Sequence, residues 1–443
     1  MEILKGPRGV PAVLLGRAGS YDPDGPLSAA EKAGAWSSWR TAVMSASPQA
    51  ILRTIADSGL RGRGGAGYPT GAKWRAAAAA EGEQRYVVAN GFEADPGAQL
   101  DRALMERDPH TIVEGVALAA YAVGATHAYI GVRASLAVAH RRLAAAVAAA
   151  EAAGLLGSDA LGAGFDLHIE VVAVPGGFVV GEETTLLRAI ENKRAQPDQR
   201  PPYPAGKGLW GQPTVVNNVE TLAAVSWIVA NGAAAFADIG DPEMPGTTLV
   251  QVTGAVARPG IVEVPLGMSV GKLIDLAGGM TEGMDLKAAL VGGPAGGFLP
   301  RAALKTLYVP AQLEAAGAIC GSGTIVVAAE DACLVEMATL LERYLSDESC
   351  GKTIPCRIGV RRLYEIGRRA TLGLSRPTDP RVLADLASDV RDGALCGLEY
   401  CAPNPFTSLM RYFESEFEDH FTRGHCPAGV CSPIKLSVEP VSA

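Results

Sequence analysis

The sequence predicts an α/β protein: a doubly wound parallel sheet, then a smaller α+β module, then a C-terminal helical bundle. Between about residues 85 and 225, short apolar strands alternate with helical segments, which is typical of βαβ units. An alternating strand pattern follows at 247–264. Beyond residue 331 the apolar residues recur at helical spacing, which favours packed helices.

The first part of the chain begins with an arm, residues 1–46, that contains Pro and Gly turns. Ser47 and Pro48 have the residue types of an N-cap and a first helical position, so they predict a helix to about Asp57. The α/β domain is expected over 47–240. Its predicted strands are Arg85–Ala89, Ala128–Val132 and Leu167–Val174, and its predicted helices are Lys73–Ala80, His110–Gly124, Ser135–Ala153, Thr184–Ile190 and one opening at 217–221.

The remaining segments complete the predicted organisation. Residues 195–214 are rich in proline and are expected to wrap over the surface without regular structure. The α+β module is expected over 245–328 and the bundle over 330–443. The predicted helices of the bundle are Leu334–Leu345, Cys356–Arg369, Pro380–Gly393 and Thr407–Phe421.

The composition excludes several classes of protein. The formal net charge of −8 argues against a general nucleic-acid binder. No apolar run reaches the length of a membrane span, and residues 1–25 lack the apolar core of a signal peptide. All eight cysteines lie in the last third of the chain, which favours metal or iron–sulfur ligation over a disulfide framework. A cytoplasmic protein is therefore expected.

A glycine-rich loop is the strongest local feature. Five glycines fall within ten positions, and basic side chains surround them. Bare amides ahead of a helix form an anion nest, so this loop is interpreted as a phosphate cradle. The alternative is a mobile loop with solvated charges. The residues are Arg61, Gly62, Arg63, Gly64, Gly65, Gly67, Gly71 and Lys73.

Residues 60–74, Leu-Arg-Gly-Arg-Gly-Gly-Ala-Gly-Tyr-Pro-Thr-Gly-Ala-Lys-Trp, resemble the FMN loop of the NADH-binding flavoprotein subunit of respiratory complex I. The same loop is found in the flavoprotein subunits of NAD-linked hydrogenases and formate dehydrogenases. The resemblance extends from about residue 50 to residue 431. It implies a Rossmann-like FMN domain, a ubiquitin-like β-grasp (soluble-ligand-binding) module, and hydride exchange between NADH and FMN. One-electron transfer to iron–sulfur centres, in this chain or in a partner, would follow.

The resemblance also implies roles for particular side chains. Amide groups and Gly181 would hold the flavin, and acidic residues on two loops would contact nicotinamide or its ribose. Two tyrosines would lie beside adenine, and Arg200 with Lys73 would lie near phosphate. Each has a simpler alternative: a cap, a solvated face or ordinary packing. The amides are Asn90, Asn217 and Asn218, the acids Glu93, Asp95, Glu182 and Glu183, and the tyrosines Tyr68 and Tyr203.

Two positions depart from the family pattern near the nucleotide. Phe92 stands where the family usually has Asp, and Ala76 where an aromatic residue often sandwiches adenine. These departures leave a second hypothesis open, namely a non-catalytic redox-sensing or assembly module that keeps the fold without turnover.

The segment around Cys350 and Cys356 resembles the family's iron–sulfur motif, Ser-Cys-Gly-x-Cys-x-Pro-Cys-Arg, with Cys396 as the distant fourth cysteine. The middle position is Thr353, whose hydroxyl is a poor iron ligand. Three outcomes are open. Cys401 substitutes, or a three-cysteine site holds a 3Fe–4S cluster or a 4Fe–4S cluster with a non-cysteine ligand, or the cluster has been lost and the thiols are structural.

A second metal site is predicted near the end of the chain. His420, Cys426 and Cys431 lie within twelve residues, and two thiolates with an imidazole suit tetrahedral zinc. Cys333 is the expected fourth ligand, since the family's hydrogenase-type members bring the corresponding segments together. His425 is the rival nitrogen ligand, and free buried thiols are the alternative.

The resemblance implies partners as well. They are a small 2Fe–2S thioredoxin-like subunit and a larger iron–sulfur or catalytic subunit of a hydrogenase, a formate dehydrogenase or a complex I-like assembly. The hydrogenase-like C-terminal segments favour the soluble NAD-linked systems.

Overall fold

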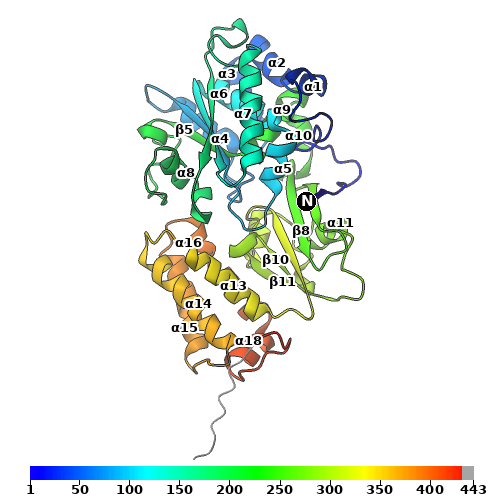
Figure 1. Ribbon diagram of the computed structural model, residues 1–443, viewed down its shortest axis with the longest axis vertical. Helices are drawn as coiled ribbons and strands as arrows, with labels where there is room; N and C mark the ends of the chain where they lie inside the picture. The colour runs from blue at the N-terminus through cyan, green and yellow to red at the C-terminus, as the bar shows by residue number, and fades with distance from the viewer. Residues whose placement is uncertain (432–443) are drawn as a thin grey trace, which may run out of the picture.

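The computed structural model describes residues 1–431, and its three parts follow one another along the longest axis (Figure 1). An α/β part forms one end, a second sheet lies in the middle, and a helical bundle forms the other end. This agrees with the predicted fold class. Residues 432–443, the end of the predicted bundle, lie outside the described part of the chain.

The α/β part is built on a four-stranded parallel sheet in the order β4-β3-β2-β5. The strands are β2 (Tyr86–Gly91), β3 (His127–Arg133), β4 (His168–Val174) and β5 (Thr214–Asn218). Its main helices are α3 (Pro48–Asp57), α4 (Thr70–Ala79), α5 (Leu100–Arg107), α6 (Pro109–Val123), α7 (Ala137–Ala152), α8 (Glu183–Ile190) and α9 (Val219–Asn231). The three predicted strands are confirmed. β5 was missed because it follows the proline-rich wrap and its five residues end in two polar amides.

The strand order creates a switch point. β2 pairs with β3 on one side and with β5 on the other. The chain therefore adds β3 and β4 on one side of β2 and then crosses back to add β5 on the other side. Asn90 of β2 is in register with Asn218 of β5. In open α/β sheets ligands bind at the carboxyl ends of the strands at such a point, and the three predicted amide residues all lie there.

Of the two helices that flank the glycine-rich loop, α3 starts as simple capping rules require. The Ser47 hydroxyl accepts a hydrogen bond from the Ala50 amide at 3.2 Å, with Pro48 at the first position of α3. Helix α4 begins at Thr70, three residues before the predicted start. Gly71 belongs to its packing, because a Cβ there would lie 2.5 Å from the Ala56 Cα of α3.

The second sheet has six strands in the order β1-β9-β8-β12-β10-β11. Strand β1 comes from the amino terminus and pairs in parallel with β9, so the predicted arm is tied to this module. The Glu263 carboxylate also accepts bonds from the amides of Val13, Leu14 and Leu15. The strands are β1 (Glu2–Ile3), β8 (Thr247–Gly254), β9 (Gly260–Pro265), β10 (Leu286–Val291), β11 (Gly297–Pro300) and β12 (Thr324–Ala329), with helices α11 (Val270–Leu276) and α12 (Pro310–Ala315).

The bundle contains α13 (Leu334–Asp347), a π-helical turn (Pro355–Val360), α14 (Arg361–Thr371), α15 (Asp379–Asp392), α16 (Gly397–Cys401), α17 (Asn404–Tyr412) and α18 (Glu414–Phe421). The prediction of one helix over Thr407–Phe421 is wrong. The chain breaks at Phe413, whose ψ of 42° is not helical. The arm and the link to the second sheet add α1 (Leu27–Lys32), α2 (Ser37–Ser45), α10 (Ala233–Ala237), β6 (Gly240–Asp241) and β7 (Met244–Pro245).

No helix among residues 1–431 has the length and apolar character needed to cross a bilayer.

Candidate flavin and metal sites

The glycine-rich loop closes as a narrow turn at the sheet edge. The Gly62 amide donates to the Tyr68 carbonyl at 2.9 Å. Gly65 and Gly67 have φ of +99° and +61°, a region that side-chain-bearing residues rarely adopt. A Cβ on Gly64 would lie 3.3 Å from the Asn218 Cβ, so the loop lies directly against the end of β5.

The basic residues of the loop have different environments. The Arg63 guanidinium is buried and donates to the carbonyls of Thr247 and Pro245 at 3.0 and 2.5 Å. Burial lowers the pKa of Arg63 to about 10. The Arg61 side chain donates to the Gly67 carbonyl at 3.1 Å. Arg63 therefore fastens the loop to the second sheet, and the phosphate roles of both arginines stay predictions.

Lys73 lies at the end of β5 among protein partners, and its phosphate role stays a prediction. Its Nζ donates to the Val216 carbonyl at 2.8 Å and to Glu183 at 3.1 Å. Glu183 also pairs with Arg200 at 3.0 Å. The structure thus brings two predicted cations and one predicted acid together at the carboxyl end of β5.

The three predicted amide residues meet at the same edge, and each also has a bond within the protein. Asn90 Nδ2 donates to the Gly181 carbonyl at 2.8 Å. Asn217 Oδ1 accepts from the Trp74 indole at 2.8 Å, and Asn218 Oδ1 caps α9. The Asn217 Nδ2 forms no hydrogen bond within residues 1–431, so it is available to a ligand.

The acids of the first loop are buried. Glu93 accepts bonds from the amides of Asp101 and Arg102 at the start of α5, at 3.1 and 3.2 Å. Burial and the Asp101 charge raise the pKa of Glu93 to about 8. Asp95 accepts a hydrogen bond from the Ser322 hydroxyl, and burial raises the pKa of Asp95 to about 6.

Glu182, on the second loop, leaves an orphaned acceptor. Its Oε2 caps α8 by accepting from the Thr185 amide at 2.9 Å. Its Oε1 is buried and has no hydrogen-bond partner among the described residues. A buried acceptor without a donor is costly, and a ligand N–H would relieve that cost.

The aromatic positions divide into exposed and buried ones. Tyr68 and Tyr203 are 56% and 61% exposed, so their rings are accessible to a ligand. Phe92 is instead buried beneath the Arg133 guanidinium, which lies 5.6 Å from the centre of its ring. Ala76 is exposed. Phe92 has therefore joined the core of the sheet.

These features fit an isoalloxazine nucleotide. The loop supplies glycine backbone and a cation for phosphate, the switch point supplies amides, and Glu182 supplies an unsatisfied acceptor.

The second flavin loop touches the cysteine motif. The Phe178 amide donates to Glu348 Oε2 at 2.6 Å. A Cβ on Gly177 would overlap the same oxygen, so only glycine permits this approach. Arg194 donates to the Cys350 carbonyl at 3.2 Å. The loop at the carboxyl end of the parallel sheet and the cysteine motif are therefore in direct contact.

The predicted cluster motif is hydrogen-bonded to a buried carboxylate. Cys356 and Cys396 are buried and Cys350 is half-buried. The Thr353 hydroxyl donates to Glu399 Oε1 at 2.6 Å, and Glu399 is 1% exposed. Three thiols and a carboxylate are thus gathered by the loop and by α16, a donor set that fits an iron–sulfur cluster.

Cys401 packs against the same apolar cluster as Cys356. Burial raises the pKa of its thiol to about 11. Its role as a substitute ligand stays a prediction.

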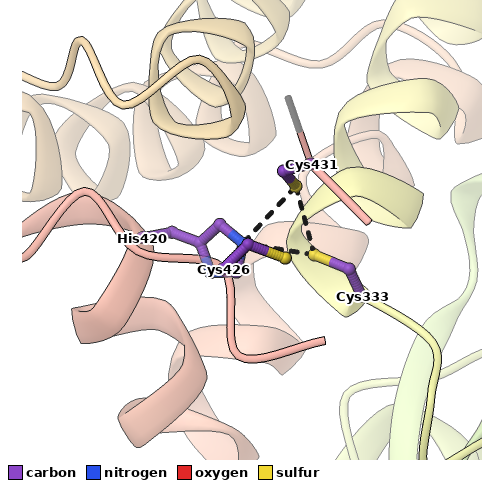
Figure 2. Close-up of side chains that lie close together, drawn as sticks. All are labelled: Cys333, His420, Cys426 and Cys431. Carbon is purple, nitrogen blue, oxygen red and sulfur yellow. Dashed lines mark hydrogen bonds between the residues drawn. The ribbon is translucent and has the colours of Figure 1, made fainter. Parts of the chain in front are cut away.

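The second predicted metal site is a compact tetrad. Figure 2 shows the side chains of Cys333, His420, Cys426 and Cys431 converging from the start of α13, from α18 and from the segment after it. Their ligand atoms all lie within 4.8 Å of one another. Cys333 Sγ is 3.2 Å from His420 Nε2 and 3.6 Å from Cys431 Sγ. Tetrahedral zinc with Zn–S bonds of about 2.3 Å places its ligands about 3.8 Å apart, so the tetrad fits one ion.

The imidazole of the tetrad is already oriented. His420 Nδ1 bonds to the Glu416 carbonyl at 2.8 Å, which leaves Nε2 for a metal. Burial acts to raise the pKa of Cys426, but hydrogen bonds from Cys431 and His420 lower it to about 6. His425, the rival ligand, is exposed.

Comparison with known proteins agrees with this geometry. The family described as "Nuo51 FMN-binding domain" matches residues 55–227, the "SLBB domain" matches 249–299, and the "NADH-ubiquinone oxidoreductase-F iron-sulfur binding region" matches 336–420. The fold, the flavin site at the carboxyl ends of β2 and β5, and the cysteine motif together define a flavoprotein subunit of an NAD(H)-dependent, multi-subunit oxidoreductase.

More particularly, the chain belongs to the family of F-type subunits of NADH-quinone oxidoreductase and their hydrogenase counterparts. It is 43% identical over 393 residues to the NADP-reducing hydrogenase subunit HndC of Solidesulfovibrio fructosivorans, covering 88% of this chain and 80% of that protein. It is 39% identical to the second F-type subunit of the NADH-quinone oxidoreductase of Rhizobium meliloti, covering 91% and 97%. A crystal structure of an NAD+-reducing [NiFe]-hydrogenase in the H2-reduced state matches at a TM-score of 0.79 and 32% identity, covering 93% of this chain and 67% of that one.

The main functional prediction, an NADH-oxidising flavoprotein subunit with FMN and an iron–sulfur region, is therefore confirmed over the non-catalytic alternative.

Sequence reasoning missed two residues of the site. Glu399 lies three residues after Cys396, but a single glutamate gives no sequence signal of a ligand, so the non-cysteine ligand left open by the sequence had no named residue. Glu348 was missed because its contact with Phe178 joins segments 170 residues apart, a separation that no local pattern reveals.

Proposed function

We propose that this chain is the nucleotide-handling subunit of a hydrogenase- or formate dehydrogenase-type assembly, with a small 2Fe–2S thioredoxin-like subunit as its neighbour. The 43% identity to the NADP-reducing hydrogenase subunit favours this over a quinone-linked complex. The paired contacts between the second flavin loop and the cysteine motif carry the proposal. They give electrons a short exit from the sheet edge to the bundle.

The residues at the switch point have separate tasks. Lys73 and the loop amides neutralise the phosphate, and Asn90, Asn217 and Asn218 orient the ring. Bound FMN supplies the hydride-exchange and one-electron chemistry. Gly181 keeps the second loop close to the ring, since a Cβ there would lie 3.1 Å from Ala94.

The acids and the tyrosines handle the nucleotide. Glu182 and Glu183 at the start of α8, with Glu93 and Asp95 on the first loop, would contact nicotinamide or its ribose. Both oxygens of Glu93 accept amide hydrogens from the start of α5, so Glu93 fixes the position of its loop beside the nucleotide. Tyr68 and Tyr203 offer exposed faces for adenine.

The tetrad holds structural zinc. Zinc has no redox chemistry of its own, so its task is to fix α18 and the segment after it against the start of α13. All eight cysteines are unpaired, which is consistent with a reducing cytoplasmic compartment.

The test is anaerobic titration of the purified chain with NADH and, separately, with NADPH. We expect bound flavin to bleach with one nucleotide and to pass electrons to ferricyanide. Lys73→Ala should weaken FMN binding about tenfold to a hundredfold, because a charge-assisted bond is lost. Lys305→Ala, which changes an exposed lysine beside the second sheet, is the matched control. A chain that binds no flavin would contradict the proposal.

A further inference from the structure

We propose that Glu399 completes the iron–sulfur site of this chain as a carboxylate ligand, together with Cys350, Cys356 and Cys396. The inference rests on the iron–sulfur function given above and names the ligand at the position that the cysteine motif leaves vacant. Thr353 serves as a positioning residue for the carboxylate.

The position of Glu399 is the first reason. Its Oε1 accepts from the Thr353 hydroxyl at 2.6 Å and from the Cys356 amide at 3.1 Å. The carboxylate therefore lies beside the side chain that replaces the middle cysteine of the motif. Its own helix, α16, starts directly after Cys396.

The second reason is the state of the carboxylate. Glu399 is 1% exposed, and no lysine, arginine or histidine of the described chain forms an ion pair with it. Three donors surround it: the Thr353 hydroxyl, the Cys356 amide and the Leu395 amide at 2.8 Å from Oε2. An ionised carboxylate offers about four acceptor positions, so Oε2 keeps one for iron.

Charge is the third reason. A buried anion without a counter-ion is unfavourable, and the cationic core of a cluster is such a counter-ion. Three thiolates and one carboxylate carry the same total charge as the four thiolates of a typical cubane. A threonine hydroxyl in place of the carboxylate would leave the ligand set one negative charge short.

Hydrogen bonds separate Glu399 from Cys401. The Glu399 carboxylate accepts from the Thr353 hydroxyl and from the Cys356 amide. Among the described residues, no hydrogen bond joins Cys401 to the cysteine motif at 349–356. The carboxylate is therefore the group that the motif itself holds in place.

The experiment uses the full chain, reconstituted anaerobically with iron and sulfide, and measures iron, sulfide, EPR and FMN on each preparation. Wild type should hold about four irons and be EPR-silent when oxidised. Glu399→Gln keeps the shape of the side chain but not its charge. It should lose about one iron and show the S = 1/2 signal of an oxidised 3Fe–4S cluster. Adding Thr353→Cys to that variant should restore about four irons, and Cys401→Ser should behave as wild type.

A second measurement does not depend on any variant. Reduced wild type labelled with ¹³C-glutamate should show ¹³C hyperfine coupling to the cluster in pulsed EPR.

Several results would overturn the inference: wild-type iron and EPR in Glu399→Gln, loss of iron in Cys401→Ser, absence of the ¹³C coupling, or a cluster that assembles only after Thr353→Cys. The last would mean that the Thr353–Glu399 pair closes the site. FMN content separates these results from a failure of the flavin function, because the flavin site holds none of the substituted residues.

Discussion

The two cysteine groups of the bundle lie at opposite ends of one helix and differ in almost every physical respect. Cys333 caps the start of α13, and the Cys350 motif follows its end. Fourteen residues of α13 separate the groups by about 21 Å at the usual rise of a helix. The first group is preformed, with ligand atoms as close as 3.2 Å. In the second, the motif is hydrogen-bonded to the Glu399 carboxylate, and its thiols form no comparably tight set of donors within residues 1–431.

The difference indicates what each group can hold. One small ion needs four donors nearly in contact with each other, whereas a cubane holds its ligands apart around a larger body. The first group (Cys333, His420, Cys426 and Cys431), called the compact group below, also brings together two segments distant in sequence. The second group (Cys350, Cys356 and Cys396), called the open group, contacts the second flavin loop through the hydrogen bond between Glu348 and Phe178. Structural and electron-transfer roles thus follow from spacing and neighbours, since both groups consist mainly of cysteine thiols.

The largest effect should come from breaking the compact group. His420→Ala removes a zinc ligand and should lower the free energy of unfolding by about 4 kcal/mol or more, because the metal contributes directly to folding. Flavin and iron should remain. Zinc analysis and urea unfolding check this, with exposed His425→Ala as the control. Equal stability of both variants would refute a structural metal.

Replacing a ligand of the open group should have the opposite result, with iron lost and zinc retained. Cys356→Ser should reduce iron from about four atoms per chain to fewer than about one, with zinc content unchanged. Flavin bleaching by NADH should persist, because the flavin edge uses none of the cysteines. Metal analysis and stopped-flow absorbance distinguish the two outcomes. Concerted loss of zinc and iron would show that the groups are not independent.

A buried glutamate on α13, the helix between the two groups, should make the stability of the protein depend on pH. Glu342 of α13 is fully buried, and both carboxylate oxygens lack partners among the described residues. Burial raises its pKa well above the usual value. The folded state therefore keeps a proton that the unfolded state releases above about pH 4.3.

Because of Glu342, the free energy of unfolding should fall as the pH rises from about 4.3 toward the pKa of the folded state. The slope should be up to about 1.4 kcal/mol per pH unit. Glu342→Gln should remove that slope. Unfolding of both proteins between pH 5 and pH 8 measures it, and parallel curves would exclude the effect.

The smallest effect concerns tuning of the open group. The Ser349 hydroxyl lies 3.0 Å from Cys356 Sγ, and hydrogen bonds to ligand sulfur influence cluster potential. Ser349→Ala should lower the potential by about 40 mV, the one-electron equivalent of a hydrogen bond of about 1 kcal/mol. A redox titration followed by EPR gives the value. An unchanged potential would mean that the hydroxyl does not donate to the sulfur.

The sequence by itself determined the fold class, the glycine-rich loop and the four members of the compact tetrad. Local rules suffice for most of these: the strand–helix alternation has a fixed period, Ser47 and Pro48 signal a helix start, and three of the tetrad residues lie within twelve positions of each other. Cys333 lies 87 residues before His420, and its place in the tetrad was predicted from the family resemblance. Only the tertiary structure decided the rest. β5, the switch point between Asn90 and Asn218, the burial of Arg63 against the second sheet and the Glu399 carboxylate beside Thr353 join segments far apart in the chain. Long-range packing sets those contacts, and no local pattern of residues encodes it.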